Sequence, residues 1–272
     1  MIILLKEGVE MQTLERKTIK QIDFNCDLGQ SFGVYKNNYE RNLVEYCSSV
    51  NVSCGFHAGD PISISEALKA AKEANVVVGA HIGFNDIQGF GYREMNLSND
   101  EIEAIVIYQV GALMSFAKTY SLEIEHVRPH GAMYKLASED FEFSKAIANA
   151  IKKCSKWLVY YGAAGETIER VAAETNIPIA REVFLEKMYR ADGTIDSQAR
   201  DIENTEVCIK RLKNLLTYSQ VSNNEGGKTF LNVDTIHFSS KLSNSKDLIK
   251  SAREIITPVP VNYKNVYESG WV

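Results

Sequence analysis

Long apolar runs, paired cysteines and an excess of basic charge are all missing from this 272-residue sequence. No apolar run approaches the roughly 18–20 residues of a membrane span. The five cysteines include no CxxC pair, and their odd number favours reduced thiols over a disulfide framework. A formal net charge of −5 gives no basic surface of the kind that nucleic acids require. We therefore expect a cytoplasmic protein with neither a membrane nor a nucleic acid as its partner.

The first twenty residues show no targeting signal. The apolar residues 1–5 are too few for the core of a signal peptide, and no small-residue cleavage site follows them. Codons for Lys6-Glu7-Gly8 can spell a purine-rich leader, so we hypothesise that translation starts at Met11. We interpret residues 1–20 as an N-terminal extension with a non-native start, and residues 21–272 as a single (β/α) barrel catalytic domain.

Short apolar strands alternate with amphipathic helices along the rest of the chain. Runs such as Val76-Val77-Val78 are typical of parallel strands that are covered on both faces. Asp60 and Ser98 are good N-cap residues for the two helices that begin after them. The predicted strands span residues 21–26, 49–54, 75–80, 123–128, 157–161, 179–184 and 232–237, and further helices are predicted over residues 140–153, 165–174, 201–218 and 245–256.

This alternation predicts the α/β class, and within it an irregular (β/α) barrel with seven strands. A doubly wound open sheet is the structural alternative. No GxGxxG motif follows the first strand, which argues against a dinucleotide-binding fold. Gly226-Gly227-Lys228-Thr229 is similar to the end of a phosphate-binding loop, but a strand-like segment follows it where a helix is required. We interpret this segment as an ordinary polar loop.

Titratable residues stand at the ends of several predicted strands. Asp27, His57, His81 and His130 each follow a strand, and His237 closes the seventh. In a parallel barrel these positions converge on the rim at the carboxyl ends of the strands. One aspartate with two or three histidines suits a divalent metal such as Zn²⁺, Mn²⁺ or Co²⁺. The same residues suit metal-free acid–base catalysis, so both interpretations stay open.

Other polar residues near these histidines have both a structural and a functional interpretation. Asp60 is either an N-cap or a ligand contact at a helix N-terminus. Asp86 and Arg93 lie in one glycine-rich loop, and Arg128 precedes a rigid Pro-His turn, so both arginines are candidates for binding an anionic group. His126 lies inside its strand, and we assign it no role.

Several stretches of the sequence resemble the LamB/YcsF family of 5-oxoprolinase A subunits. The match extends from residue 21 to about residue 200 and keeps the family's order, and its central block is long and unusual. The matching stretches are NCDLGQSFG from Asn25, NVSCGFHAGDP from Asn51, GAH from Gly79, GFGYR from Gly89, PHGAMY from Pro129 and REVF from Arg181.

The resemblance implies a deformed (β/α) barrel of the glycoside hydrolase/polysaccharide deacetylase-like type. It implies ATP-dependent opening of 5-oxo-L-proline (pyroglutamate) to L-glutamate, carried out with B and C subunits that handle the ATP. By analogy with the deacetylase-like barrels, it implies Asp27, His57 and His130 as metal ligands or acid–base groups. Whether the chain also forms a homo-oligomer stays open.

For such a reaction we hypothesise a separate role for each candidate residue. Asp27 with His57 polarises the lactam carbonyl, directly or through a metal, and His130 is the general acid. His81 or Asp86 positions the water, and Arg93 or Arg128 holds the substrate carboxylate. The candidate substrate-binding residues are Asn25, Asp60, Asp86, Arg93 and Arg128.

The sequence also departs from the family pattern. Gln30 stands where the family usually has Glu, and Arg128 stands where it usually has Lys. The usual Ala-Asp-Arg is Leu185-Glu186-Lys187 here, and the usual Gly-Asp after His237 is Phe238-Ser239. Two alternatives therefore stay open: a stand-alone metal-dependent amidohydrolase or deacetylase for another small amide, and a substrate-binding subunit without catalysis.

Overall fold

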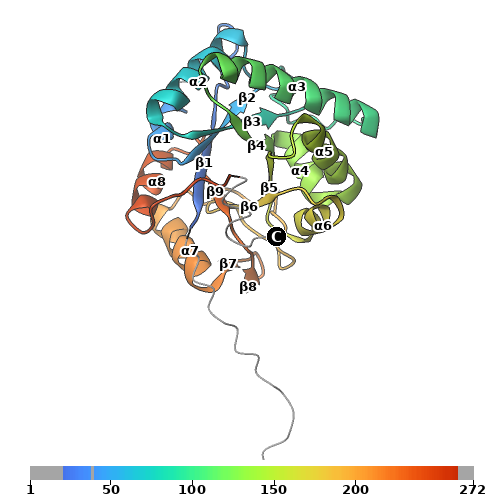
Figure 1. Cartoon of the computed structure of the whole chain (residues 1–272). Helices are drawn as coiled ribbons and strands as arrows, with labels where there is room; N and C mark the ends of the chain where they lie inside the picture. The colour runs from blue at the N-terminus through green and yellow to red at the C-terminus, as the bar shows by residue number, and fades with distance from the viewer. Residues whose placement is uncertain (1–20, 38–39, 263–272) are drawn as a thin grey trace, which may run out of the picture.

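Seven parallel strands close into a barrel in the computed structural model, which describes residues 21–37 and 40–262. The barrel strands are β1 (Asp23–Leu28), β2 (Ser49–Ser53), β3 (Val77–Ile82), β4 (Ile124–Pro129), β5 (Val159–Ala163), β6 (Ile179–Phe184) and β9 (Thr235–His237). β9 pairs with both β6 and β1 and so closes the ring (Figure 1). The predicted seven-stranded barrel is therefore confirmed, and the open-sheet alternative is wrong. The predictions for residues 1–20 lie outside the described residues.

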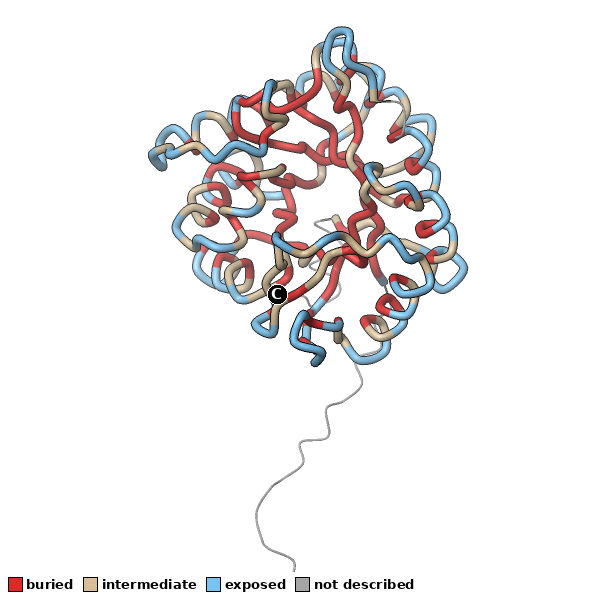
Figure 2. The backbone as a smooth tube through the Cα atoms, turned by 180° about the vertical axis from the view of Figure 1, so that it is seen from behind, coloured by how far each residue is buried: buried red, intermediate tan, exposed pale blue. Residues whose placement is uncertain are grey.

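The helices form a layer around the barrel. They are α1 (Arg41–Val44), α2 (Pro61–Ala74), α3 (Asn99–Thr119), α4 (Gly131–Glu139), α5 (Phe141–Cys154), α6 (Glu166–Thr175), α7 (Thr205–Tyr218) and α8 (Ser245–Arg253). Figure 2 shows the consequence: the central strands are buried, and exposed backbone lies on the outer turns of the helices. Each helix covers the strands with one apolar face, which is how a parallel sheet hides both of its surfaces.

Helix boundaries follow the predicted caps. The Asp60 side chain accepts a hydrogen bond from the Ser63 backbone N–H at 2.7 Å and so caps α2. Ser98 and Glu101 form a reciprocal capping box at the start of α3. Both N-caps predicted from the sequence are therefore confirmed.

The apolar helix α3 is long enough to cross a membrane by length and composition, with a mean hydropathy of 1.2 over 18 residues. In the fold it packs against α5, β3 and β4. Its buried residues include Ile102, Val106, Val110 and Leu113, which lie at helical spacing along one face. The barrel core accounts for this apolar face.

Three features differ from the prediction. Asp27 and His81 lie inside their strands, because β1 and β3 extend two residues further than predicted. α4 begins directly after His130, where the sequence suggested only a turn, and Gly131 enters it with a left-handed φ of 54°. Residues 220–230 form a small antiparallel hairpin outside the barrel, made of β7 (Gln220–Ser222) and β8 (Lys228–Phe230).

Candidate functional site

Hydrogen-bonded polar side chains fill the middle of the barrel. Asn25 on β1 donates to Glu182 Oε1 at 2.9 Å and to Thr235 Oγ1 at 2.7 Å, and it accepts from Asn51 Nδ2 at 2.8 Å. The predicted substrate-binding residue Asn25 is thus fully buried with its amide satisfied by protein groups. His126 Nε2 lies 2.8 Å from Asn51 Oδ1, so this histidine belongs to the same network.

Asp27 lies directly above this network, and one of its oxygens has four neighbours. Oδ1 lies 3.1 Å from Asn51 Nδ2 and 3.3 Å from Arg128 Nη1. His81 Nε2 lies 3.3 Å and His237 Nε2 3.2 Å from the same oxygen. Burial alone would raise the pKa of Asp27, but His81, His237 and Arg128 hold it well below its usual range. Asp27 is therefore an ionised carboxylate that joins three cationic or titratable groups.

Arg128 and Glu182 form a buried ion pair across the barrel. Arg128 Nε donates to Glu182 Oε1 at 2.8 Å and to Oε2 at 2.9 Å. The side chains are 6% and 0% exposed. Burial would raise the pKa of Glu182, but the positive charge of Arg128 lowers it. Arg128 therefore carries a fixed positive charge between Glu182 and Asp27.

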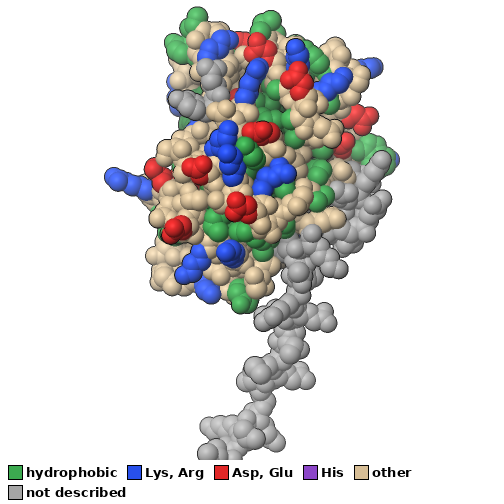
Figure 3. Space-filling view, turned by 90° about the vertical axis from the view of Figure 1, so that its left-hand side faces the viewer, with side chains coloured by type: hydrophobic (Ala, Val, Ile, Leu, Met, Phe, Trp, Pro, Cys, Tyr) green, Lys and Arg blue, Asp and Glu red, His purple; other side chains and the backbone are tan. Residues whose placement is uncertain are grey.

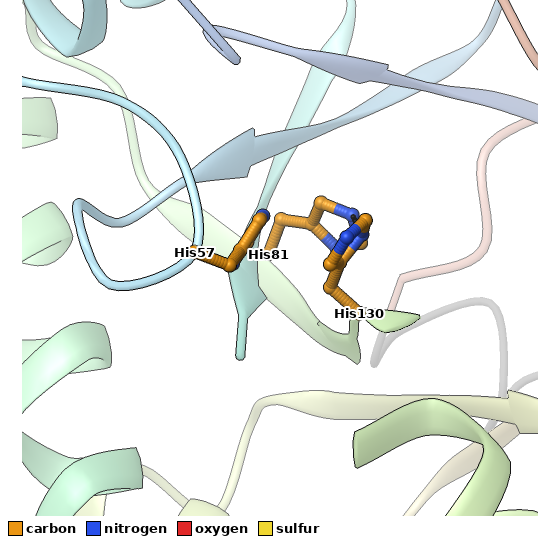
Figure 4. A group of neighbouring side chains, drawn as sticks. All are labelled: His57, His81 and His130. Carbon is orange, nitrogen blue, oxygen red and sulfur yellow. Dashed lines mark hydrogen bonds between the residues drawn. The ribbon is translucent and has the colours of Figure 1, made fainter. Parts of the chain in front are cut away.

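His57, His81 and His130 form a compact buried group (Figure 4). Their candidate ligand nitrogens all lie within 4.8 Å of one another. The ring of His57 stacks on that of His130, with centroids 4.1 Å apart and an angle of 11° between the planes. His81 meets both rings edge-on. The sequence predicted Asp27, His57 and His130 as the metal ligands. In the structure His81 takes the place of Asp27 in this group, and Asp27 contacts the group through His81.

Hydrogen bonds to the backbone fix which nitrogens of this group carry hydrogen. His81 Nδ1 lies 3.1 Å from the carbonyl oxygen of Arg128, and His130 Nε2 lies 2.8 Å from that of Phe90. A carbonyl oxygen only accepts, so both of these nitrogens are donors. In neutral rings, His81 Nε2 and His130 Nδ1 therefore both present lone pairs, and they face each other at 3.1 Å. Two facing lone pairs repel each other, and a cation held by both nitrogens, either a shared proton or a metal ion, would remove that repulsion.

The third histidine supports the same conclusion. His57 Nε2 lies 3.2 Å from the Ser53 hydroxyl, whereas its buried Nδ1 has no hydrogen-bond partner among the described residues. Burial lowers the pKa of His57, His81 and His130 below the usual histidine value, which favours neutral, metal-binding rings. Backbone carbonyls that orient imidazoles are the usual outer contacts of histidine metal ligands. The three histidines therefore fit a divalent metal.

Two glycines make room for the rings. A Cβ at Gly83 would stand 2.5 Å from His57 Nδ1, and a Cβ at Gly91 would stand 2.8 Å from atoms of both His57 and His130. Gly91 also has a left-handed φ of 73°. The packing of the histidine rings therefore requires glycine at positions 83 and 91.

A cavity of about 510 Å³ opens beside Asp27 at the carboxyl ends of the strands. Of the predicted site residues, Asp27, Arg128 and His130 line it, whereas Asn25, His57, His81, Asp60, Asp86 and Arg93 do not. The other lining residues include His237, which was predicted to lie on this rim but was given no role, and Tyr92, Tyr134, Glu186, Lys187 and Lys241. The family motifs already contained Tyr92 and Tyr134, which could have been selected for that reason. Glu186 and Lys187 stand where the family usually has Asp-Arg, and no role was predicted for them from that change; Lys241 lies outside the matching stretches.

Three predicted substrate-binding residues are engaged elsewhere. The Asp60 carboxylate caps α2 and also accepts from the Gly33 N–H at 2.8 Å. Asp86 Oδ1 accepts from Arg93 Nε at 2.7 Å, so the two residues of the glycine-rich loop pair with each other. The pKa of Asp86 falls to about 2 chiefly because of Arg93. This ion pair fixes the loop whose Phe90 carbonyl orients His130.

Gln30, where the family usually has Glu, contacts the site directly. Its side-chain amide lies 3.4 Å from Asp27 Oδ2, with the nitrogen as donor. The substitution therefore keeps a polar contact to Asp27 without adding a second negative charge. Phe238, in place of the usual Gly, is buried and packs on Phe24 with ring centroids 4.8 Å apart.

The surface shows no area of a single charge on the face in Figure 3, where acidic and basic side chains are interspersed. This agrees with the small net charge of −5. Charged side chains also line the cavity at the barrel mouth, among them Asp27, Arg128 and Lys187.

A closed parallel barrel with a carboxylate and histidines gathered at its carboxyl-end rim defines the class of (β/α) barrel proteins with an enzyme-like site. Within this class the chain belongs to the LamB/YcsF family, whose sequence profile matches residues 22–269. It is 36% identical over 251 residues to the 5-oxoprolinase A subunit of Natranaerobius thermophilus, covering 91% of this chain and 98% of that protein. It is 41% identical over 219 residues to the Bacillus thuringiensis protein of the same name, covering 79% and 87% of the two chains.

A solved structure gives the same result for the fold. The lactam utilization protein of Thermus thermophilus superposes with a TM-score of 0.81 and 33% identity, covering 92% of this chain and 97% of that one. The family and the barrel predicted from the sequence are thus confirmed.

Proposed function

We propose that this chain is the A subunit of a 5-oxoprolinase, which opens 5-oxo-L-proline to L-glutamate with ATP as co-substrate and with B and C subunits as partners. The observation that carries the proposal is the cavity in which Asp27, Arg128 and His130 meet, in a chain that matches proteins named as 5-oxoprolinase A subunits over nearly their whole length. The name of the Thermus relative, a lactam utilization protein, supports a cyclic amide as the substrate.

The geometry supports specific roles for the catalytic candidates. Asp27, His57, His81 and His130 form one electrostatic unit, because Asp27 contacts His81 and His81 contacts His130. This unit lies at one side of the cavity, where it can hold the water and the lactam carbonyl in place. If His57, His81 and His130 hold a divalent metal, the ion supplies Lewis-acid polarisation of that carbonyl.

Arg128 is better placed than Arg93 to attract the substrate carboxylate. Arg128 lines the cavity and is 6% exposed at its side chain, so its charge acts in a poorly solvated space. Arg93 lies outside the cavity lining and is paired with Asp86. Among the predicted substrate-binding residues, we therefore assign the carboxylate to Arg128.

The test is glutamate release from 5-oxo-L-proline and ATP by the chain combined with its B and C subunits. His57→Ala and His130→Ala should each lower the rate at least about 100-fold, because each removes a member of the unit that holds the water and the lactam carbonyl in place. An exposed substitution such as Lys153→Met, on the outer face of α5, serves as the control. Near-normal glutamate release by both histidine variants would refute the catalytic assignment of His57 and His130. Tight binding of 5-oxoproline by the full complex without any glutamate would point to a non-catalytic role.

The three-histidine group also favours a second candidate, a metal-dependent amidohydrolase that acts alone. Two measurements separate the amidohydrolase from the 5-oxoprolinase. One is metal analysis of the purified chain before and after chelation, and the other is the ATP requirement of the reaction. Stoichiometric metal with ATP-independent turnover of a small amide supports the amidohydrolase. Glutamate formation that needs ATP and both partner subunits supports the 5-oxoprolinase.

A further inference from the structure

Opening a lactam requires a proton source as well as an activated carbonyl, because the departing ring nitrogen must be protonated. This consideration rests on the proposed function. His130 is poorly suited to supply the proton, since its Nε2–H is held by the Phe90 carbonyl and its Nδ1 faces His81. The ammonium groups at the cavity are also engaged: Lys135 with Glu94 at 2.8 Å, Lys187 with Asp201 at 2.6 Å and Lys241 with the Tyr92 hydroxyl at 2.7 Å.

Glu186 is a cavity residue with none of these restraints. It lies two residues beyond the end of β6, which places it on the carboxyl-end rim. It lines the cavity although it is only 1% exposed. Its Oε1 atom has no hydrogen-bond partner among the described residues. Its backbone is held in place, because the Ile202 N–H donates to the Glu186 carbonyl at 2.8 Å.

Burial is the main influence on this side chain and raises the pKa of the Glu186 carboxyl. The titratable or charged groups near it are His237, Lys187, Asp201, Arg211, Tyr189 and Cys208. A raised pKa favours the protonated form of a buried carboxyl, and that form can give its proton to a bound substrate. Tyr134 also lines the cavity, but burial raises the pKa of its hydroxyl well above 10, so it is a much weaker acid.

Arg211, on α7, supplies a second unexplained group in the same region. It is 3% exposed, and Nε, Nη1 and Nη2 all lack hydrogen-bond partners among the described residues. Its guanidinium lies 5.7 Å from the centroid of the Tyr189 ring. Burial lowers the pKa of Arg211, and the nearby Glu186 acts in the opposite direction. A buried cation without an anionic partner is costly, unless a neighbouring acid becomes charged during the reaction.

We propose that Glu186 is the general acid of the ring opening and that Arg211 is a positioning residue, which stabilises the carboxylate left after proton transfer. A water oxygen bonds to the ring carbonyl carbon, and the electron pair of the breaking C–N bond moves to nitrogen. That nitrogen takes the Glu186 proton and becomes the amine of glutamate. The proton shed by the water returns to Glu186 through solvent. A second water takes the terminal phosphoryl group of ATP, the co-substrate of the proposed reaction, as the bond from that phosphorus to the bridging oxygen breaks, which leaves ADP and phosphate.

The experiment measures glutamate release by the complete complex of A, B and C subunits across a pH series. Glu186→Gln keeps the size of the side chain and removes its acidity, so kcat should fall about 10²- to 10⁴-fold with KM for 5-oxoproline changed less than about threefold. Glu186→Asp should recover part of kcat. Glu103→Gln, at a partly exposed carboxylate on α3, is the matched control, and unfolding by urea confirms that each variant is folded.

The pH profile separates a catalytic role from a structural one. In the wild type, kcat should fall at high pH as Glu186 loses its proton, and Glu186→Gln should lack this limb. Arg211→Met should move the limb to higher pH, because the carboxylate loses its stabilising charge. If the wild type and folded Glu186→Gln both release glutamate normally, the role of Glu186 is overturned and the proposed function is not. If Glu186→Gln does not fold, an unchanged profile in Glu186→Asp overturns it. No glutamate from the wild-type complex overturns the proposed function and this role together.

Discussion

Replacing Arg128 by methionine should destabilise the barrel strongly, because it leaves a buried carboxylate without its cation. Glu182 is fully buried, and it would keep the hydrogen bond from Asn25 at 2.9 Å but lose the ion pair. Removing one partner of a buried pair typically costs about 3–5 kcal/mol. Arg128 also lies 3.3 Å from Asp27, so a second carboxylate loses a positive neighbour. We therefore expect the free energy of unfolding to fall by about 3–5 kcal/mol in Arg128→Met.

Urea unfolding followed by circular dichroism measures this change, and a double-mutant cycle assigns it. Arg128→Met/Glu182→Gln should be more stable than Arg128→Met, since the second substitution removes the unpaired charge. Lys153→Met, which breaks the exposed pair with Glu103, should cost less than about 1 kcal/mol. The reasoning is refuted if Arg128→Met loses no more than this control, or if Glu182→Gln destabilises the Arg128→Met background further.

Three further substitutions test other parts of the molecule. Gly83→Ala should displace the His57 ring, lower glutamate release at least tenfold and cost about 1–3 kcal/mol of stability, and an active, stable variant would contradict this packing. Asp60→Ala should lower thermal stability by about 1 kcal/mol through the lost N-cap while most activity remains, and the opposite pattern would make Asp60 a binding residue. Burial raises the pKa of Glu40 from 4.5 to about 8, so the folded state holds a proton that the unfolded chain releases, and stability should fall as pH rises from about 5 to 8. Glu40→Gln should flatten this fall in urea unfolding at a series of pH values, and an unchanged slope would assign it to another group.

Periodicity predicted the barrel well, because buried parallel strands leave a clear apolar pattern. The seven runs, among them the one at Val76-Val77-Val78, correspond to the seven barrel strands. The convergence of Asp27, His57, His81 and His130 also followed, since all parallel strands end at one rim. α4 was missed because Pro129 and Gly131 together look like a turn, although the left-handed Gly131 starts a helix beneath Gly91.

Pairings between distant residues could not be predicted in this way. Arg128 and Glu182 are 54 positions apart, and their contact depends on how β4 and β6 lie across the barrel. Arg93 had the composition of a substrate-binding cation, yet its partner is Asp86 in its own loop. Glu186 and Lys187 stand where the family usually has Asp-Arg, but their place at the cavity could not be predicted, because burial of a single carboxyl beyond a strand leaves no periodic pattern. The hydrogen-bond donors of His81 and His130 depend on backbone carbonyls, whose positions a sequence does not state.

The position of Asp27 shows why the histidine group and the cavity should act together. Its carboxylate lies within 3.3 Å of His81, the centre of the histidine group, and of Arg128, a wall of the cavity. A substrate carboxylate that approaches Arg128 competes with Asp27 for the same positive charge, so Asp27 then interacts more strongly with His81 and with any cation that the histidines hold. Occupation of the cavity and the charge of the histidine group are thereby coupled through one carboxylate oxygen atom. Because a coupling free energy is reciprocal, a cation in the histidine group should in turn strengthen the binding of an anionic substrate.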